Sequence, residues 1–229
     1  MLLQYAEALC AKRLVLASAS PRRREILGNL VRFSQREEVA DCCFSPQPLS
    51  TADSPHPEAQ GLKFEVVVSK FDEDLDKVEF SSAADYAKAT AMHKAVEVAD
   101  RMERCKDEKT PFMIIGSDTV VEAPDGSIME KPSDEKEAMA MLLSLQGVTH
   151  QVHSGVGIVF PDPSRPGGRL VKSFSETTCV TFAELRKAEM AAYIKTGEPF
   201  DKAGGYGTSL SSNSKHCFCL FINTSCVYR

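Results

Sequence analysis

The chain has 229 residues and a net charge of −5. This length suits one large α/β domain or two small ones, and the acidic balance argues against a general nucleic-acid-binding protein, which carries a basic surface. No apolar run approaches the length of a membrane span, and residues 1–13 lack the basic start and apolar core of a secretory signal. We therefore expect a cytoplasmic protein that binds neither membranes nor nucleic-acid polymers.

The first motif is a short apolar run that leads through small residues into a helix. Residues 14–17 are predicted to form a buried strand and residues 21–31 a helix. Ser20 is suited to cap this helix, and Arg22 and Arg23 then lie in its first turn, where the helix dipole favours anions. Two arginines there indicate either a phosphate-binding site, which the planar guanidinium suits, or a solvated basic helix face.

The next segments differ sharply in composition. Residues 35–61 are rich in proline and have no periodicity, so we expect a mobile insertion there. Residues 64–68 are rich in β-branched side chains and predict a strand. An acidic stretch follows over residues 69–76. Its carboxylates form either a solvated turn or a set of oxygen ligands for Mg²⁺.

The longest predicted helix covers residues 82–104, where apolar side chains recur at helical spacing. Lys88 and Lys94 both flank the apolar stripe. The stem of a lysine can lie along such a stripe while its ammonium stays in water. Periodicity therefore does not distinguish a functional lysine from a structural one at either position.

A second buried strand is predicted over residues 113–115, with Asp118 just after it. An ionised carboxylate within an apolar run is costly unless it is paired or coordinated, and the carboxyl end of a strand is where α/β folds place ligands. Capping of a turn by Asp118 is an equally weighted alternative. Asp125 and Gly126 then predict a hairpin turn, and Lys131, which precedes a proline, is expected to be extended.

The second half of the chain predicts two helices, two long strands and a glycine-rich loop. Ser133 is expected to cap the first helix, and Gly147 to end it. The strands, the second helix and the loop are predicted over residues 148–160, 169–182, 183–195 and 198–207. Glycines allow a close approach of backbone to a ligand, but they also simply make turns.

Four of these segments, in this order, resemble motifs of the Maf family of nucleoside triphosphate pyrophosphatases. They are Leu16-Ala17-Ser18-Ala19-Ser20-Pro21-Arg22-Arg23, Ile115-Gly116-Ser117-Asp118-Thr119-Val120-Val121, Glu130-Lys131-Pro132, and Gly197-Glu198-Pro199-Phe200-Asp201-Lys202-Ala203-Gly204-Gly205-Tyr206-Gly207. The resemblance is nearest to the dTTP/UTP pyrophosphatase branch. It places an N-terminal extension at 1–13, a Maf-like domain at 14–207 that contains the proline-rich insertion, and an atypical tail at 208–229.

The resemblance implies an α/β fold of the Maf and ITPase type, in which helices flank a long mixed sheet and two lobes surround a central cleft. It also implies an enzyme of the nucleotide pool that hydrolyses dTTP, UTP or modified nucleotides to the monophosphate and pyrophosphate. The implied cofactor is a divalent cation, Mg²⁺ or Mn²⁺, and the implied assembly is a homodimer.

The same resemblance assigns roles to residues by position. Asp118 matches the catalytic acidic residue, and Glu73 and Asp118 match carboxylates that hold the metal. The positions that match the phosphate pocket are Ser20, Arg22, Arg23, Lys94 and Lys131. It is therefore the resemblance that prefers Lys94 over Lys88. Arg22 and Thr119 match positions tied to the choice of base, and Ser209 stands where the family has a base-selecting glutamine.

Two alternatives follow from departures of this sequence from the family pattern. Residues after Gly207 no longer resemble the family, which suggests a nucleotide-binding regulator with impaired catalysis. A pyrophosphatase for 7-methyl-GTP is the other alternative. The run Pro21-Arg22-Arg23 favours the pyrimidine branch over it, because the methyl-guanine branch usually has an aromatic residue after that proline.

Overall fold

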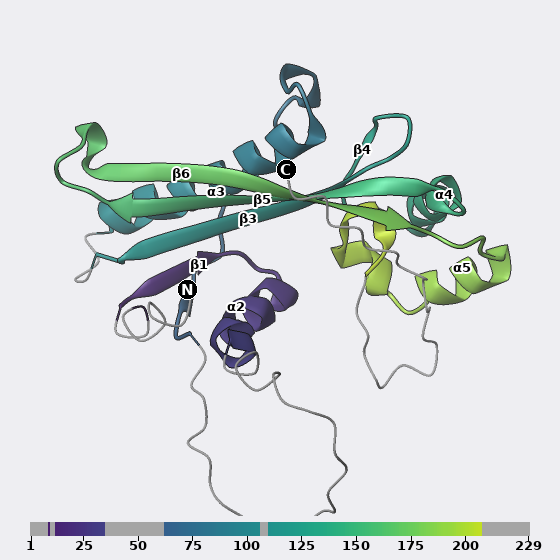
Figure 1. Cartoon of the computed structure of the whole chain (residues 1–229), viewed down its shortest axis with the longest axis horizontal. Helices are drawn as coiled ribbons and strands as arrows, with labels where there is room; N and C mark the ends of the chain where they lie inside the picture. Colours follow the sequence, from purple (N-terminus) through teal and green to yellow (C-terminus); the bar gives the residue numbers. More distant parts are fainter. Residues whose placement is uncertain (1–8, 10–11, 35–61, 106–109, 208–229) are drawn as a thin grey trace, which may run out of the picture. The chain divides into compact units, whose positions relative to one another are not determined.

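The computed structural model describes residues 9, 12–34, 62–105 and 110–207, and the fold is built on one mixed β-sheet (Figure 1). The strands follow the order β2-β1-β3-β5-β6, and β4 pairs with β3 outside this path. They are β1 (Leu14–Ala17), β2 (Glu65–Val66), β3 (Met113–Glu122), β4 (Ile128–Met129), β5 (Thr149–Pro161) and β6 (Arg169–Thr181). Strand β1 runs parallel to β2 and β3, whereas β4 is antiparallel to β3.

In the described part of the chain, four α-helices flank the sheet. They are α2 (Pro21–Ser34), α3 (Ala83–Arg104), α4 (Glu135–Leu145) and α5 (Lys187–Ile194), with short 3₁₀ turns between some of the elements. The predicted α/β fold with a long mixed sheet flanked by helices is therefore confirmed. No helix in the described part of the chain is both long and apolar enough to cross a membrane.

The contacts divide the chain into two compact units, each built from three separate segments. Unit 1 comprises residues 1–70, 94–116 and 158–171, and unit 2 comprises residues 71–93, 117–157 and 172–229. Helix α3 and strands β3, β5 and β6 each contribute residues to both units. The two units agree in number with the two expected lobes, and the cleft stays a prediction.

The core of unit 1 forms where helix α3 meets the edge-to-edge pair of β1 and β3. All four residues of β1 are at most 2% exposed, because β2 and β3 pair with it on either side. Val15 and Ala17 pack with Val98 of α3 and Ile114 of β3 in one buried cluster. This packing fixes the end of β1, and with it the start of the turn into α2.

Within unit 2, helix α3 and strand β5 approach each other backbone to backbone. A Cβ atom on Gly155 would lie 2.2 Å from the carbonyl oxygen of Ala87, and one on Gly157 would lie 2.5 Å from Cα of Met92. Any larger residue at these positions would therefore force the helix away from the strand. Because neither glycine has a side chain, the backbones of α3 and β5 can lie this close together.

Several element boundaries differ from those predicted. Helix α4 is capped by Asp134, not by Ser133, because the Asp134 carboxylate accepts the backbone N–H of Glu137 at 2.8 Å. Ser133 instead donates to the Glu137 side chain. Helix α5 begins at Lys187 rather than near 183, because the Glu189 carboxylate accepts the backbone N–H of Arg186 and fixes the start there.

The strands differ as well. Strand β2 is only two residues long, although residues 64–68 have strand-like composition. Strand β3 continues without a break from Met113 to Glu122, where the sequence predicted a strand followed by a loop. The predicted insertion at 35–61 and the tail at 208–229 lie outside the described residues.

Candidate active site

The first site motif is the turn from β1 into α2 in unit 1. Helix α2 begins at Pro21, and Ser20 Oγ accepts the backbone N–H of Arg23 at 3.5 Å. A guanidinium N–H of Arg23 also donates to Ser18 Oγ at 3.4 Å, and Ser18 is buried. The first turn contains no acidic residue, so the positive end of the helix dipole and the side chain of Arg22 add to one basic region. The predicted capping by Ser20 is confirmed.

The two lysines of α3 have different surroundings. Lys94 is 7% exposed and belongs to unit 1. Lys88 is half-buried in unit 2 and is ion-paired with Asp85 at 2.5 Å. A buried ammonium is costly unless an anion compensates it, whereas a partly exposed pair such as Lys88–Asp85 contributes little. The two lysines therefore differ in burial, and the preference for Lys94 stays a prediction.

Asp118 lies inside strand β3 and not in a loop after it. The residues of β3 alternate between buried and partly exposed, and Asp118 is on the buried side with 7% exposure. Its negative charge contributes to a raised pKa of the Tyr86 hydroxyl, so Asp118 and Tyr86 are near each other in unit 2. The alternative that Asp118 caps a turn is wrong, because the strand continues through it. Thr119 follows on the partly exposed face.

Glu73 is exposed on an irregular stretch that precedes helix α3. Glu73 and Asp118 both belong to unit 2. Among the described residues there is no group of three or more His, Cys, Asp and Glu side chains that could hold a metal ion. Glu73 and Asp118 stay the two predicted carboxylate ligands, a number that is usual for Mg²⁺ bound together with substrate phosphates and waters.

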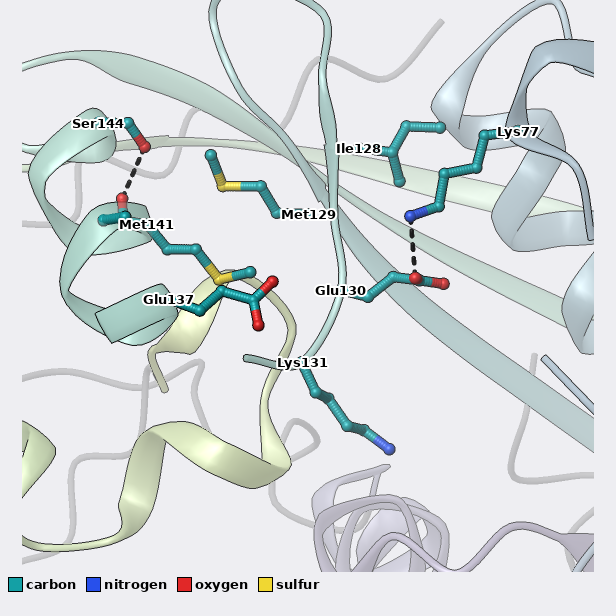
Figure 2. Close-up of a pocket in the computed structure, with 9 residues that line it drawn as sticks. Lys77, Ile128, Met129, Glu130, Lys131, Glu137, Met141 and Ser144 are labelled. Atoms are coloured by element: carbon teal, nitrogen blue, oxygen red, sulfur yellow. Dashed lines mark hydrogen bonds and ion pairs between the residues drawn. The ribbon is translucent and has the colours of Figure 1, made fainter. Parts of the chain in front are cut away.

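The segment after β4 is held in place on several sides, and Figure 2 shows the bond from Lys77 to Glu130. The Tyr86 hydroxyl donates to Glu130 Oε1 at 2.7 Å, and the Lys77 ammonium donates to Glu130 Oε2 at 2.9 Å. The backbone carbonyl of Glu130 accepts the N–H of Gly204 at 3.0 Å. Lys131 itself is exposed, and its side chain points away from Glu130.

A pocket of about 430 Å³ lies beside this segment in unit 2. Strand β4, the residues after it and helix α4 supply most of its lining (Figure 2). The lining residues are Lys77, Ile128, Met129, Glu130, Lys131, Glu137, Ala140, Met141 and Ser144. Two methionines therefore face a pocket whose polar side chains are already hydrogen-bonded in part.

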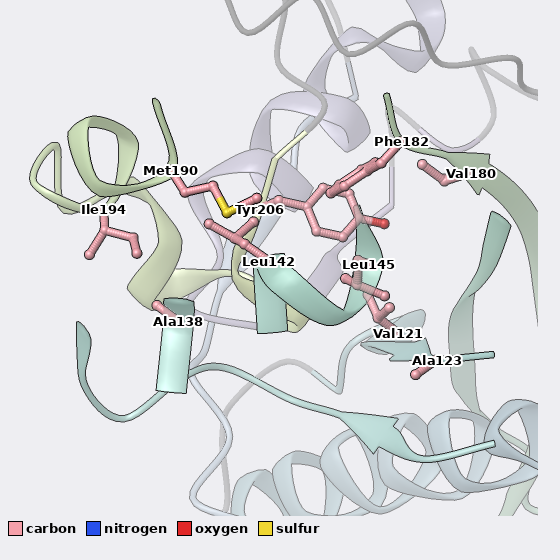
Figure 3. Close-up of a cluster of buried hydrophobic side chains, with 10 residues drawn as sticks. All are labelled: Val121, Ala123, Ala138, Leu142, Leu145, Val180, Phe182, Met190, Ile194 and Tyr206. Atoms are coloured by element: carbon pink, nitrogen blue, oxygen red, sulfur yellow. The ribbon is translucent and has the colours of Figure 1, made fainter. Parts of the chain in front are cut away.

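The glycine-rich loop is anchored through Tyr206, which packs into the largest buried cluster of unit 2 (Figure 3). Its ring makes edge-to-face contacts with Phe182 and His150, at centroid distances of 4.7 and 5.5 Å. Its hydroxyl lies 2.7 Å from Nε2 of His150. Burial lowers the pKa of His150, so this buried ring is uncharged. The loop is thus fixed to the core at the residue that follows Gly204 and Gly205.

The structure divides the predicted site residues between the two units. Unit 1 contains Ser20, Arg22, Arg23 and Lys94, and unit 2 contains Glu73, Asp118, Thr119 and Lys131. Unit 1 thus carries three of the four predicted phosphate-binding cations, and unit 2 carries both carboxylates. Ser209 lies outside the described residues.

Sequence reasoning missed Tyr86 and Lys77, and it noted Glu130 only as part of a motif. Helical spacing did indicate the buried side of α3, but it does not show which acceptor a hydroxyl on that side meets. The partners Tyr86 and Glu130 are 44 positions apart in the chain.

The sequence model described as Maf-like protein matches residues 57–214. The human "Probable bifunctional dTTP/UTP pyrophosphatase/methyltransferase protein" is 42% identical over 200 residues, which are 87% of this chain and 27% of that protein. The dTTP/UTP pyrophosphatase of Bacillus cereus (strain ATCC 10987 / NRS 248) is 35% identical over 196 residues, which are 86% of this chain and 73% of that enzyme. The chain therefore spans about a quarter of the human relative's length.

Solved structures offer a weaker likeness. The nucleoside-triphosphatase / dITP/XTP pyrophosphatase of Mycobacterium abscessus (ATCC 19977 / DSM 44196) is 12% identical, with a TM-score of 0.35. The similarity covers 76% of this chain and 75% of that one. A likeness at this level assigns no residue of the site.

Proposed function

The chain belongs to the Maf-like protein family, and from this membership we propose that it hydrolyses nucleoside triphosphates, with dTTP and UTP as preferred substrates. The products would be the nucleoside monophosphate and pyrophosphate. The observation that carries the proposal is Asp118, an acidic side chain buried in a central strand within the second family motif. The proposal concerns the pyrophosphatase activity alone, because the chain spans only part of the bifunctional human relative.

Binding of the triphosphate would rest on the basic side chains. Hydrolysis of a phosphoanhydride needs neutralisation of phosphate charge more than it needs covalent help. Arg22 and Arg23, at the start of α2, can each present two N–H groups to phosphate oxygens. Lys94 and Lys131 would add point charges. Arg22 and Thr119 would also contribute to the choice of base.

Asp118 would orient the attacking water and take its proton. A carboxylate is a competent general base when it is positioned within hydrogen-bond reach of the water. Direct attack by water needs no covalent intermediate, and the sequence offers no nucleophilic triad. As the water oxygen bonds to the α-phosphorus, the bond to the bridging oxygen would break and pyrophosphate would leave, and Asp118 would then release the proton to solvent.

We propose a divalent cation, Mg²⁺ or Mn²⁺, as the cofactor, with Glu73 and Asp118 as its protein ligands. The donor set fits, because Mg²⁺ is usually held by one or two carboxylates together with substrate phosphates and waters. When bound, the ion would polarise the phosphoryl group under attack. Activity should therefore vanish in excess EDTA and return when Mg²⁺ or Mn²⁺ is added.

The test is pyrophosphate release from a panel of nucleoside triphosphates that includes dTTP, UTP and 7-methyl-GTP. Asp118→Asn keeps the size of the side chain and should lower kcat by at least about 100-fold, the usual contribution of a general base. Asp162→Asn, in a surface turn of unit 1, is the matched control and should keep wild-type activity. Full activity of Asp118→Asn would refute the assignment, and tight binding without turnover by the wild type would favour the regulator instead.

We also propose that the enzyme is a homodimer that acts in the cytoplasm. The homodimer is what the family resemblance implies, and it can be tested directly. Light scattering of the purified chain, measured over a range of concentrations, should give twice the mass of one chain. A mass of one chain at all concentrations would contradict it.

A further inference from the structure

We propose that Tyr86, Glu130 and Lys77 form a clamp that positions Lys131 for the triphosphate. The inference rests on the proposed function, because it assigns a purpose to residues beside a predicted phosphate-binding lysine. Tyr86 and Lys77 each engage a different oxygen of the Glu130 carboxylate, at 2.7 and 2.9 Å. Two residues that are distant from Glu130 in the chain thus converge on it, and Glu130 lies directly before Lys131.

The tyrosine is the rigid member of this clamp. Tyr86 is 1% exposed and lies in a buried cluster with Ala83, Ala87 and Val120. Phe80 meets its ring edge-to-face, with a centroid distance of 5.5 Å and an interplanar angle of 87°. Packing on these sides holds the ring in one orientation, so the position of the hydroxyl is set before it meets Glu130.

The protonation of the clamp residues determines which group donates each hydrogen bond. Burial and the hydrogen bond to Glu130 raise the pKa of Tyr86, which keeps the hydroxyl protonated and able to donate. The Lys77 ammonium lies 5.8 Å from the centroid of the same ring, within the range of a cation–π contact. Each pair of the three side chains is therefore in contact.

The backbone around Lys131 is held from the other side by the glycine-rich loop. The N–H of Gly204 donates to the carbonyl of Glu130 at 3.0 Å. A Cβ atom on Gly205 would lie 3.7 Å from Cγ of Pro132, so the loop bonds to one neighbour of Lys131 and passes close to the other. Pro132 is itself buried. The residues on both sides of Lys131 are fixed, and its side chain alone extends to solvent.

The clamp also protects the charge of Lys131. A glutamate directly before a lysine can attract its ammonium, but Lys77 and Tyr86 occupy both oxygens of Glu130. Within the part of the chain that the structure describes, the Lys131 ammonium makes no ion pair. The charge therefore stays available for a phosphate, and less backbone freedom is lost when the phosphate binds.

A double-mutant cycle tests this inference. Tyr86→Phe keeps the packed ring and removes only the donor. With dTTP as substrate, it should lower kcat/KM by about 10- to 100-fold, the effect of losing a hydrogen bond to a charged group. In the Lys131→Ala background the same substitution should have little further effect, because the group that the clamp positions is gone. Lys77→Met should behave in the same way, and Lys77→Arg should restore most of the activity.

Lys88→Met is the matched control, since it removes a partly exposed ion pair from the same unit and should leave kcat/KM unchanged. Equal losses from Tyr86→Phe with and without Lys131, or no loss at all, would overturn the inference. Inactivity of the wild type on every triphosphate would instead refute the proposed function. The cycle would then be measured as dTTP binding by calorimetry, where the same lack of additivity is expected and additive losses would again overturn it.

Discussion

Lys94 is a buried cation on a helix that also carries a partly exposed lysine, and the two can be compared directly. Lys94→Met removes the charge and keeps the length of the side chain. We expect KM for dTTP to rise by about 10- to 100-fold, because a charge-assisted contact to phosphate is lost. Lys88→Met should leave KM unchanged, since Lys88 is paired with Asp85. Steady-state kinetics of both variants would check this, and equal effects would contradict the assignment of Lys94.

His150 predicts how stability depends on pH. Burial lowers the pKa of His150 in the folded chain below its ordinary value of 6.5, so the unfolded chain takes up a proton first as the pH falls. Acidification below about pH 6.5 therefore favours unfolding. Between about pH 7.5 and about pH 5.5, Tm of the wild type should fall more steeply than Tm of His150→Gln. Parallel Tm profiles measured by calorimetry would contradict this.

At single positions, the sequence predicted a side-chain interaction correctly where the two partners are close together in the chain. Ser20 was predicted as a cap, and its acceptor role involves a residue only three positions away. The Tyr86–Glu130 contact was not predicted, because helical spacing predicts burial but not the partner of a buried hydroxyl. Asp118 was expected beyond a strand, and the structure places it within one, because a Gly-Ser-Asp-Thr sequence is as compatible with a buried strand as with a turn.

At the scale of elements, the contact of α3 with β5 should tolerate no added atoms. Gly155→Ala would place a methyl group 2.2 Å from the carbonyl oxygen of Ala87. We expect a loss of unfolding free energy of at least about 1–3 kcal/mol from this overpacking. Gly28→Ala in helix α2 is the control. Its nearest atom would be 3.9 Å away, so it should be neutral or stabilise by up to about 1 kcal/mol. Urea unfolding of both variants would measure this, and equal stability would contradict it.

Elements with strong patterns were predicted closely. The strands expected at 148–160 and 169–182 are β5 (Thr149–Pro161) and β6 (Arg169–Thr181), because long alternating runs leave little choice. The region predicted as a strand at 64–68 pairs over only two residues. Composition indicates that a segment can be a strand, but it does not show how many of its residues pair with β1. The start of α5 moved because a side-chain cap, which periodicity does not show, sets it.

At the scale of the whole molecule, the two units share four elements, and this should make unfolding cooperative. The chain has no tryptophan, so single probes can be introduced at exposed positions. Phe112→Trp reports on unit 1, and Phe174→Trp reports on unit 2. The two urea midpoints should coincide, because neither unit can lose α3 or β5 and remain folded. Two separate midpoints, measured by fluorescence, would show that the units unfold independently.

The division into these units was not predictable from the sequence. Domain boundaries usually fall in exposed linkers, but here four of the five fall inside α3, β3, β5 and β6, where no change of composition marks them. The family resemblance suggested two lobes, and the contact pattern of the folded chain was needed to assign residues to each. That assignment is what separates the predicted cations of unit 1 from the carboxylates of unit 2.

The glycine contact between α3 and β5 has a mechanical consequence. Side chains that fill an interface can change rotamer and so let two packed elements shift. Two backbones in direct contact have no rotamers to change. Gly157 and Met92 meet in this way, and unit 2 takes its last residues from the two elements at Gly157 and His93. The contact therefore resists sliding of α3 along β5 within unit 2, because the two elements have no side chains between them that could rearrange.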